Sequence, residues 1–113
     1  MSKEKIKQEI ARLEYNPDSL DALHSEAVRC VKLKQYEECI DILNNIADLY
    51  EPTSELYLNK ALCNYHLGYI EDSMACCRDA LALDEDNENA STLLAKLQDK
   101  MDRLRKYTME VYR

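Results

Sequence analysis

The sequence predicts an all-α fold, and three observations lead to that prediction. The 113-residue chain has one glycine and two prolines, too few for the turns that a many-stranded sheet needs every ~8–12 residues. Its apolar residues are mainly leucine, alanine and tyrosine, with few β-branched residues, a composition typical of helices. Similar residues also recur at a spacing of 34, which is typical of stacked structural repeats. The length suits a single domain covering residues 1–113.

The repeat is clearest in a column of alanines. When residues 20–53 are written above 54–87, with 88 onward beneath, Ala27, Ala61 and Ala95 coincide. The same alignment places Cys39 above Ser73. Two helices approach closely only where side chains are small. We therefore expect the alanine of each first helix to face Cys39 or Ser73 on the second helix of its unit.

Each unit reads as two antiparallel helices. A helical apolar rhythm runs for about fourteen residues, breaks near Lys34 or Gly68, and restarts. Gly68 suits a turn that needs a positive φ. Residues 16–19, 51–54 and 84–87 contain Ser, Thr, Asp or Asn, whose oxygens cap helix N-termini. The predicted helices are 2–14, 20–33, 36–49, 54–67, 70–83 and 88–110.

These motifs resemble the tetratricopeptide repeat (TPR) family, a class of 34-residue helix–turn–helix repeats. The second unit carries the matching residues Tyr57, Ala61, Gly68, Ala80, Leu81, Leu83 and Asp84. In the first unit, Lys34 stands in place of the glycine and Ile46 in place of the small residue. The resemblance implies an α-solenoid with two full repeats, 20–53 and 54–87. An N-terminal half repeat (1–19) and a long C-terminal capping helix (88–113) complete it.

In such solenoids the first helices of successive units line a concave surface. Projecting the repeat positions onto this chain gives a candidate surface with an apolar centre and amide, imidazole and ammonium groups around it. It suits a peptide or helix of another protein that carries apolar side chains and an acidic group, so the resemblance implies a protein–protein interaction adaptor or scaffold. The candidate partner-binding residues are His24, Val28, Val31, Leu58, Asn59, Leu62, Tyr65, His66, Lys96 and Lys100.

A second candidate function follows from one TPR subfamily. Residues 58–63 and 77–81 are similar to repeats of co-chaperones that bind the C-terminal carboxylate of heat-shock chaperones. Asn59 matches one asparagine of their carboxylate clamp. The other clamp positions hold different residue types, which leaves the carboxylate with few charge-assisted partners. Those positions are His24, Val28, Asn89 and Leu93.

A third candidate function is structural assembly. Ile6, Ile10 and Leu13 form an apolar stripe on a predicted helix that has no hairpin partner of its own. That helix, or the C-terminal helix, could join a second copy or complete a larger complex. A stable dimer at micromolar concentration would favour this alternative over a free groove.

Charge argues against nucleic acid as a partner. The net charge is −7, with seventeen acidic and five basic residues between positions 14 and 95. Such a surface repels phosphate. Residues 96–113 carry six basic and three acidic residues and could contact an acidic partner. Every window also contains charges, so we expect no membrane-spanning segment.

The sequence gives little support to enzymatic or cofactor chemistry. Cys63 and His66 lie three residues apart and could chelate a metal or form a nucleophile pair. There is no Cys-x-x-Cys pair, and a single glycine cannot build an oxyanion or phosphate loop. We therefore expect no catalytic residue, metal or cofactor. The five cysteines, an odd number, predict reduced thiols in a cytoplasmic or nuclear protein.

Overall fold

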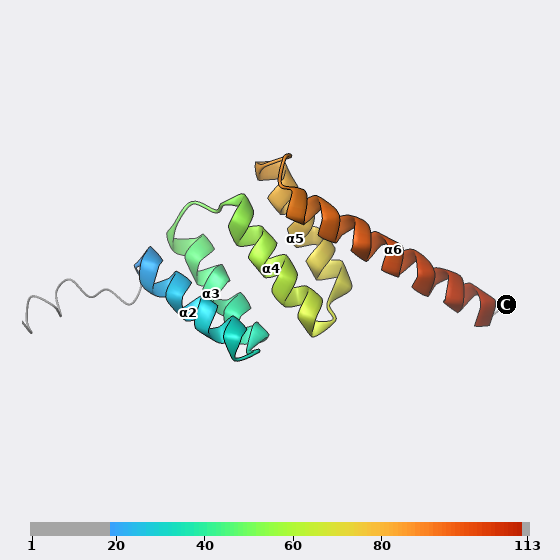
Figure 1. The fold of residues 1–113 in the computed structure, drawn as a ribbon, viewed down its shortest axis with the longest axis horizontal. Helices are drawn as coiled ribbons and strands as arrows, with labels where there is room; N and C mark the ends of the chain where they lie inside the picture. Colours follow the sequence, from blue (N-terminus) through green and yellow to red (C-terminus); the bar gives the residue numbers. More distant parts are fainter. Residues whose placement is uncertain (1–18, 112–113) are drawn as a thin grey trace, which may run out of the picture.

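The computed structural model describes residues 19–111, which form five helices and no strand. They run in the order α2 (Leu20–Lys32), α3 (Tyr36–Leu49), α4 (Ser54–Leu67), α5 (Ile70–Leu83) and α6 (Glu88–Val111). The first four make two successive hairpins, and α6 packs on the second (Figure 1). The all-α repeat prediction is confirmed, with each of these boundaries within one residue. The predicted helix 2–14, with Ile6, Ile10 and Leu13, lies outside the described residues.

The linkers position the first helix of each unit by capping its N-terminus. In each case a side-chain oxygen accepts a hydrogen bond from the backbone N–H three residues later, which satisfies one of the helix's free donors. The donor–acceptor distances are 3.1–3.2 Å. The pairs are Ser19 with Ala22, Thr53 with Leu56, and Asn87 with Ala90.

The hairpin turns share a left-handed residue. Gly68 ends α4 with φ 83°, as the turn position predicts. Lys34 occupies the same position in the first hairpin and has φ 59°. The first turn therefore adopts the glycine conformation without a glycine, at an energetic cost.

The small-residue column holds each hairpin together. The Cys39 thiol donates to the carbonyl of Ala27 at 3.6 Å, and the Ser73 hydroxyl donates to the carbonyl of Ala61 at 2.7 Å. The expected pairing of the alanines with Cys39 and Ser73 is confirmed. Ala95, the third member of the column, is exposed because no described helix packs on that face of α6.

A polar network fixes the register between α4, α5 and α6. The Ser54 hydroxyl donates to the carbonyl of Ala80 at 2.8 Å. It accepts a hydrogen bond from the amide of Asn87, also at 2.8 Å. Since Asn87 also caps α6, one buried side chain ties the start of α6 to the start of α4.

The core has two parts that meet at α4. The first is enclosed by α2, α3 and α4, and the second by α4, α5 and α6. Beyond Leu97, α6 has no fully buried residue and projects past the hairpins (Figure 1). The buried residues of the first part are Leu23, Ala27, Cys30, Cys39, Leu43, Ile46, Leu56 and Cys63. Those of the second are Leu58, Ala61, Cys76, Cys77, Ala80, Ala90, Leu93 and Leu97.

Candidate functional site

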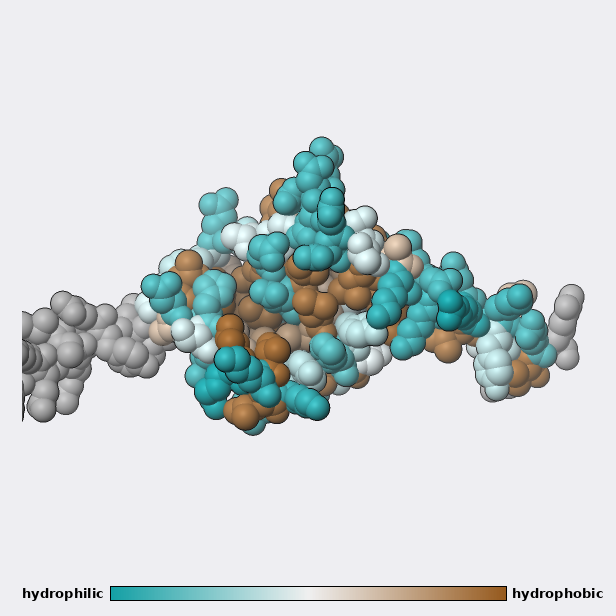
Figure 2. All heavy atoms as spheres, viewed as in Figure 1, coloured by the Kyte–Doolittle hydropathy of each residue, from teal (hydrophilic) through white to brown (hydrophobic). Residues whose placement is uncertain are grey.

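An apolar pocket of about 380 Å³ lies between α2 and α4, the first helices of the two repeats. Val28, Val31 and Leu62 line it, yet their side chains are 54%, 45% and 39% exposed. Figure 2 shows hydrophobic residues gathered over the middle of the molecule. Exposed apolar side chains grouped around a hollow are typical of a binding surface.

The rim of this pocket carries nitrogen groups and no carboxylate. Six of its lining residues were predicted from the repeat positions: His24, Val28, Val31, Asn59, Leu62 and His66. Lys32 also lines it. No Asp or Glu is among the lining residues. The electrostatic character of the pocket therefore favours an acidic ligand group beside an apolar one.

Tyr36 is a pocket residue that the sequence did not reveal. Its ring stacks on the His66 imidazole, with centroids 4.6 Å apart and planes 11° apart. The stack connects the start of α3 to the end of α4, and both rings line the pocket. Tyr36 aligns with Ile70 at the start of a second helix, a position expected on the convex side. The one sequence feature that could have indicated its role is its position just after the turn at Lys34. A residue there can reach over the pocket-facing side of the first helix.

Two thiols lie at the base of the pocket. Cys39 and Cys63 line it but are almost fully buried. Burial raises the pKa of both thiols, that of Cys63 to about 12, with its neighbour Cys39 adding to the shift. The thiols are therefore protonated at neutral pH and act as small apolar groups rather than nucleophiles.

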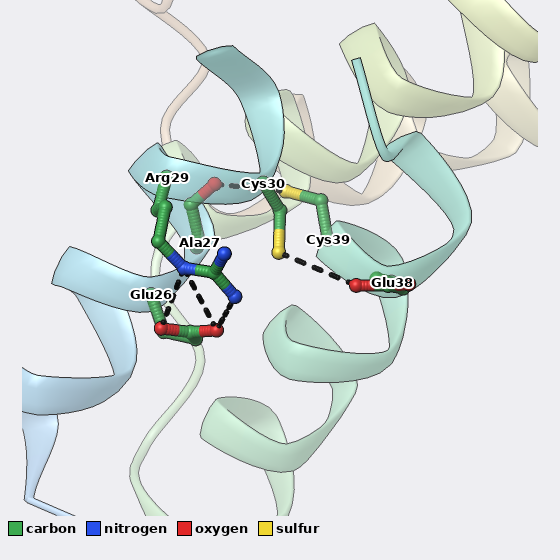
Figure 3. Close-up of polar contacts among 6 residues, drawn as sticks. All are labelled: Glu26, Ala27, Arg29, Cys30, Glu38 and Cys39. Carbon is green, nitrogen blue, oxygen red and sulfur yellow. Dashed lines mark hydrogen bonds and ion pairs between the residues drawn. The ribbon is translucent and has the colours of Figure 1, made fainter. Parts of the chain in front are cut away.

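A third thiol, that of Cys30, lies between α2 and α3, the two helices of the first hairpin. Figure 3 shows Cys30 on α2 directed toward Glu38 on α3, with 4.0 Å between sulfur and carboxylate oxygen. The neighbouring Glu26 and Arg29 form an ion pair within one helix face. The hydrogen bond that Arg29 donates to Glu26 raises the pKa of Arg29 and lowers that of Glu26. None of these groups lines the pocket: Cys30 is buried in the first part of the core, and Glu26 and Arg29 lie on the outer surface of the hairpin.

Tyr65, Lys96 and Lys100 form a separate cluster between α4 and α6. The Lys96 ammonium lies 5.0 Å from the centroid of the Tyr65 ring. Hydrogen bonding and charge from Lys96, with a smaller contribution from Lys100, lower the pKa of Tyr65. The Tyr65 ring also meets His66 edge-on at 5.5 Å. This cationic cluster therefore adjoins the apolar pocket through His66.

Leu58 is a correction to the predicted groove. Its side chain is only 4% exposed and packs in the second core with Ala61 and Leu93. The repeat position places it on the concave side, but α6 packs against that part of α4 and covers it. Leu58 therefore supports α6 and has no surface with which to bind a partner.

A metal site and a carboxylate clamp were the other two ligand sites that the sequence raised. Among residues 19–111, no group of three or more His, Cys, Asp and Glu side chains could hold a metal ion. Leu93, at one clamp position, is 8% exposed and packs in the core. Asn59 is the one matching clamp residue near the pocket.

Comparison with known proteins gives the family. Sperm-associated antigen 1 of Mus musculus is 33% identical over 84 residues, which is 74% of this chain. Tetratricopeptide repeat protein 16 of Homo sapiens is 33% identical over 75 residues, or 66% of this chain. No family model matches the sequence. Together, the 34-residue hairpins and these two similarities decide the relationship. The chain is related to the tetratricopeptide repeat family.

The TPR relationship supports a protein–protein interaction module in general terms. The chain spans about 9% of the length of each of these curated relatives. Within residues 19–111, no helix is both long and apolar enough to cross a membrane.

Proposed function

We propose that the chain is an adaptor that binds a segment of another protein in the pocket between α2 and α4. The observation that supports this most directly is the pocket itself, about 380 Å³ and rimmed by exposed Val28, Val31 and Leu62. An apolar side chain of the partner fills the pocket, and Asn59 at its edge binds the partner's backbone. An acidic group of the partner lies near Lys96 and Lys100.

The role we propose is binding and not catalysis. Cys63 and His66 are the two residues that could have formed a nucleophile pair, but neither is available for that role. The Cys63 thiol is protonated by burial, and the His66 ring is stacked on Tyr36. We propose a cytoplasmic or nuclear location, which suits five free, buried thiols. The chaperone-tail alternative lacks a supporting observation, since Leu93 is buried where the clamp needs a cation.

A peptide-display selection followed by matched variants tests this proposal. The selected peptide is resynthesised with a fluorophore, and its affinity is measured by anisotropy. We expect Leu62→Ala or Tyr65→Ala to weaken binding by about 1–3 kcal/mol, as for modest hot-spot residues. Lys96→Ala should cost less, under about 1 kcal/mol, because an exposed ammonium contributes little.

Leu83→Ala is the matched control, because Leu83 is a similarly exposed leucine on α5, away from the pocket. It should leave the affinity unchanged. If Leu62→Ala bound normally with helical content intact, the pocket would not be the binding site. A reversed order, with Lys96→Ala most harmful and an amidated peptide C-terminus inactive, would favour the carboxylate clamp.

A further inference from the structure

The second half of α6 carries an apolar stripe that is largely exposed and is covered by described residues only near Met101. Ala90, Leu94 and Leu97 pack in the second core and alternate at spacings of four and three. The same alternation continues through Met101, Leu104, Thr108 and Val111, which we call the α6 stripe. This is the a/d pattern of a coiled coil, in which one helix packs along another.

The stripe continues the α5–α6 interface into solvent. α6 has 24 residues and α5 has 14, so at 1.5 Å per residue α6 outruns its neighbour by about 15 Å. Figure 1 shows this end of α6 standing clear of both hairpins. Leu104 is 47% exposed and Val111 is 53% exposed. A shallow hollow of about 380 Å³ lies along the stripe, bordered by Arg105 and Met109.

Charge beside the outer part of the stripe is mainly positive. In the heptad frame that places Leu97 and Leu104 at d, Lys100 falls at a g position and Arg105 at an e position. These two positions flank a partner helix. Asp99 lies on the opposite face of α6, where it is paired with Arg103 at 2.7 Å. The flanking e and g positions therefore carry the cations Lys100 and Arg105, and Asp99 and Glu110 lie at outer positions of the helix. Asp102, with Glu71 of α5, lines a hollow beside Met101 and Arg105 at the inner end of the stripe.

From this continuity and this charge pattern we infer that the α6 stripe is a second docking surface, for an acidic amphipathic helix of another protein. The partner helix packs its own apolar seam on Leu104 and Val111, as the next layer after the α5–α6 interface. Asp or Glu residues beside that seam pair with Lys100 and Arg105. This surface is distinct from the pocket between α2 and α4, so it does not depend on the proposed function.

A second copy of the chain fits the stripe poorly. Two α6 stripes laid parallel and in register bring Lys100 of each copy against Arg105 of the other, which is unfavourable. The acidic helices α3 and α5 of another copy lack an apolar seam. Each presents one strongly exposed large apolar residue, Leu49 on α3 and Leu83 on α5. Neither helix can therefore fill the stripe.

The test uses two designed peptides of about three heptads with identical leucine and isoleucine seams. One carries Glu at every e and g position, and the other carries Lys. Binding to the full chain is measured by fluorescence anisotropy. We expect the Glu peptide to bind and the Lys peptide to bind at least about tenfold more weakly. Sedimentation of the chain alone and flotation with phosphatidylserine vesicles are run in parallel.

Two neighbouring charge reversals provide the matched control. Arg105→Glu and Lys106→Glu change the net charge equally, but Lys106 lies at an f position on the far face of α6. Arg105→Glu and Leu104→Glu should weaken Glu-peptide binding about fivefold or more, while Lys106→Glu stays within about twofold. Leu62→Ala should leave this binding unchanged, which separates it from the pocket. Circular dichroism checks that each variant stays helical.

Three results would overturn the inference. Equal losses in Arg105→Glu and Lys106→Glu would mean that general charge attraction, and not the stripe, holds the peptide. Self-association of the chain that Leu104→Glu abolishes would make a second copy the occupant. Binding to phosphatidylserine vesicles, lost in Leu104→Glu, without binding to the Glu peptide would assign the stripe to a membrane surface.

Discussion

At the scale of single residues, the two hairpin turns are a natural matched pair. Gly68 and Lys34 occupy equivalent positions and share a positive φ of 83° and 59°. A lysine side chain in this conformation meets its own backbone, whereas glycine does not. The two turns therefore have similar geometry at different energetic cost, and exchanging the residue types measures that cost.

We predict that Lys34→Gly stabilises the chain by about 0.5–1 kcal/mol, the relief of strain less the added entropy of the unfolded glycine. Gly68→Ala should destabilise it by about 1 kcal/mol. A Cβ added at Gly68 meets no atom within 4 Å, so the loss is conformational and not steric. Urea denaturation measures both. A destabilised Lys34→Gly variant would show that the Lys34 side chain contributes more than its backbone strain costs.

At the scale of helices, the connection between α4 and α6 depends on Asn87. Its carbonyl oxygen caps α6, and its amide donates to Ser54, which in turn donates to the end of α5. We predict that Asn87→Ala lowers the free energy of unfolding by about 1–3 kcal/mol. The change removes the N-cap of α6 and the amide that donates a hydrogen bond to the Ser54 hydroxyl. Asn44→Ala, at an exposed position in α3, is the control. It should change the free energy of unfolding by less than about 0.5 kcal/mol.

Most helix boundaries could be predicted from local chemistry. Caps such as Ser19 and Thr53, the glycine at Gly68 and the 3.6-residue rhythm all act within a few residues. The burial of Leu58 and the role of Tyr36 could not be predicted in this way. Leu58 is covered by α6, and Tyr36 reaches His66 on another repeat. Both facts depend on how helices distant in the sequence pack together.

The candidate pocket was predicted better than the cationic cluster beside it. Val28, Val31 and Leu62 follow from repeat position alone, because each lies on a first helix facing the concave side. Lys96 and Lys100 were assigned to the same groove, but they gather around Tyr65 at the α4–α6 boundary. The packing angle between α4 and α6 decides where the two lysines lie. That angle does not follow from the residues next to them in the sequence.

At the scale of the whole molecule, all five cysteines are buried between helices. A buried thiol resists losing its proton, because its thiolate would be poorly solvated. Burial raises the pKa of Cys63 to about 12 and that of Cys77 to about 11, from an ordinary value of 9.0. The two residues belong to different parts of the core, so the whole fold shares this property.

These pKa shifts predict a loss of stability at alkaline pH. Above about pH 9 the unfolded chain releases thiol protons that the folded chain retains, so the free energy of unfolding falls as pH rises. The stabilisation is complete below pH 9 and is lost progressively toward pH 11–12. Each fully protected thiol contributes a slope of at most about 1.4 kcal/mol per pH unit.

Urea denaturation between pH 7 and 10.5, with reductant present, measures this slope. The double variant Cys63→Ala, Cys77→Ala should show a shallower decline. An identical slope in the two proteins would mean that the thiols titrate alike in the folded and unfolded chains. The buried sulfurs would then not be the source of the alkaline instability.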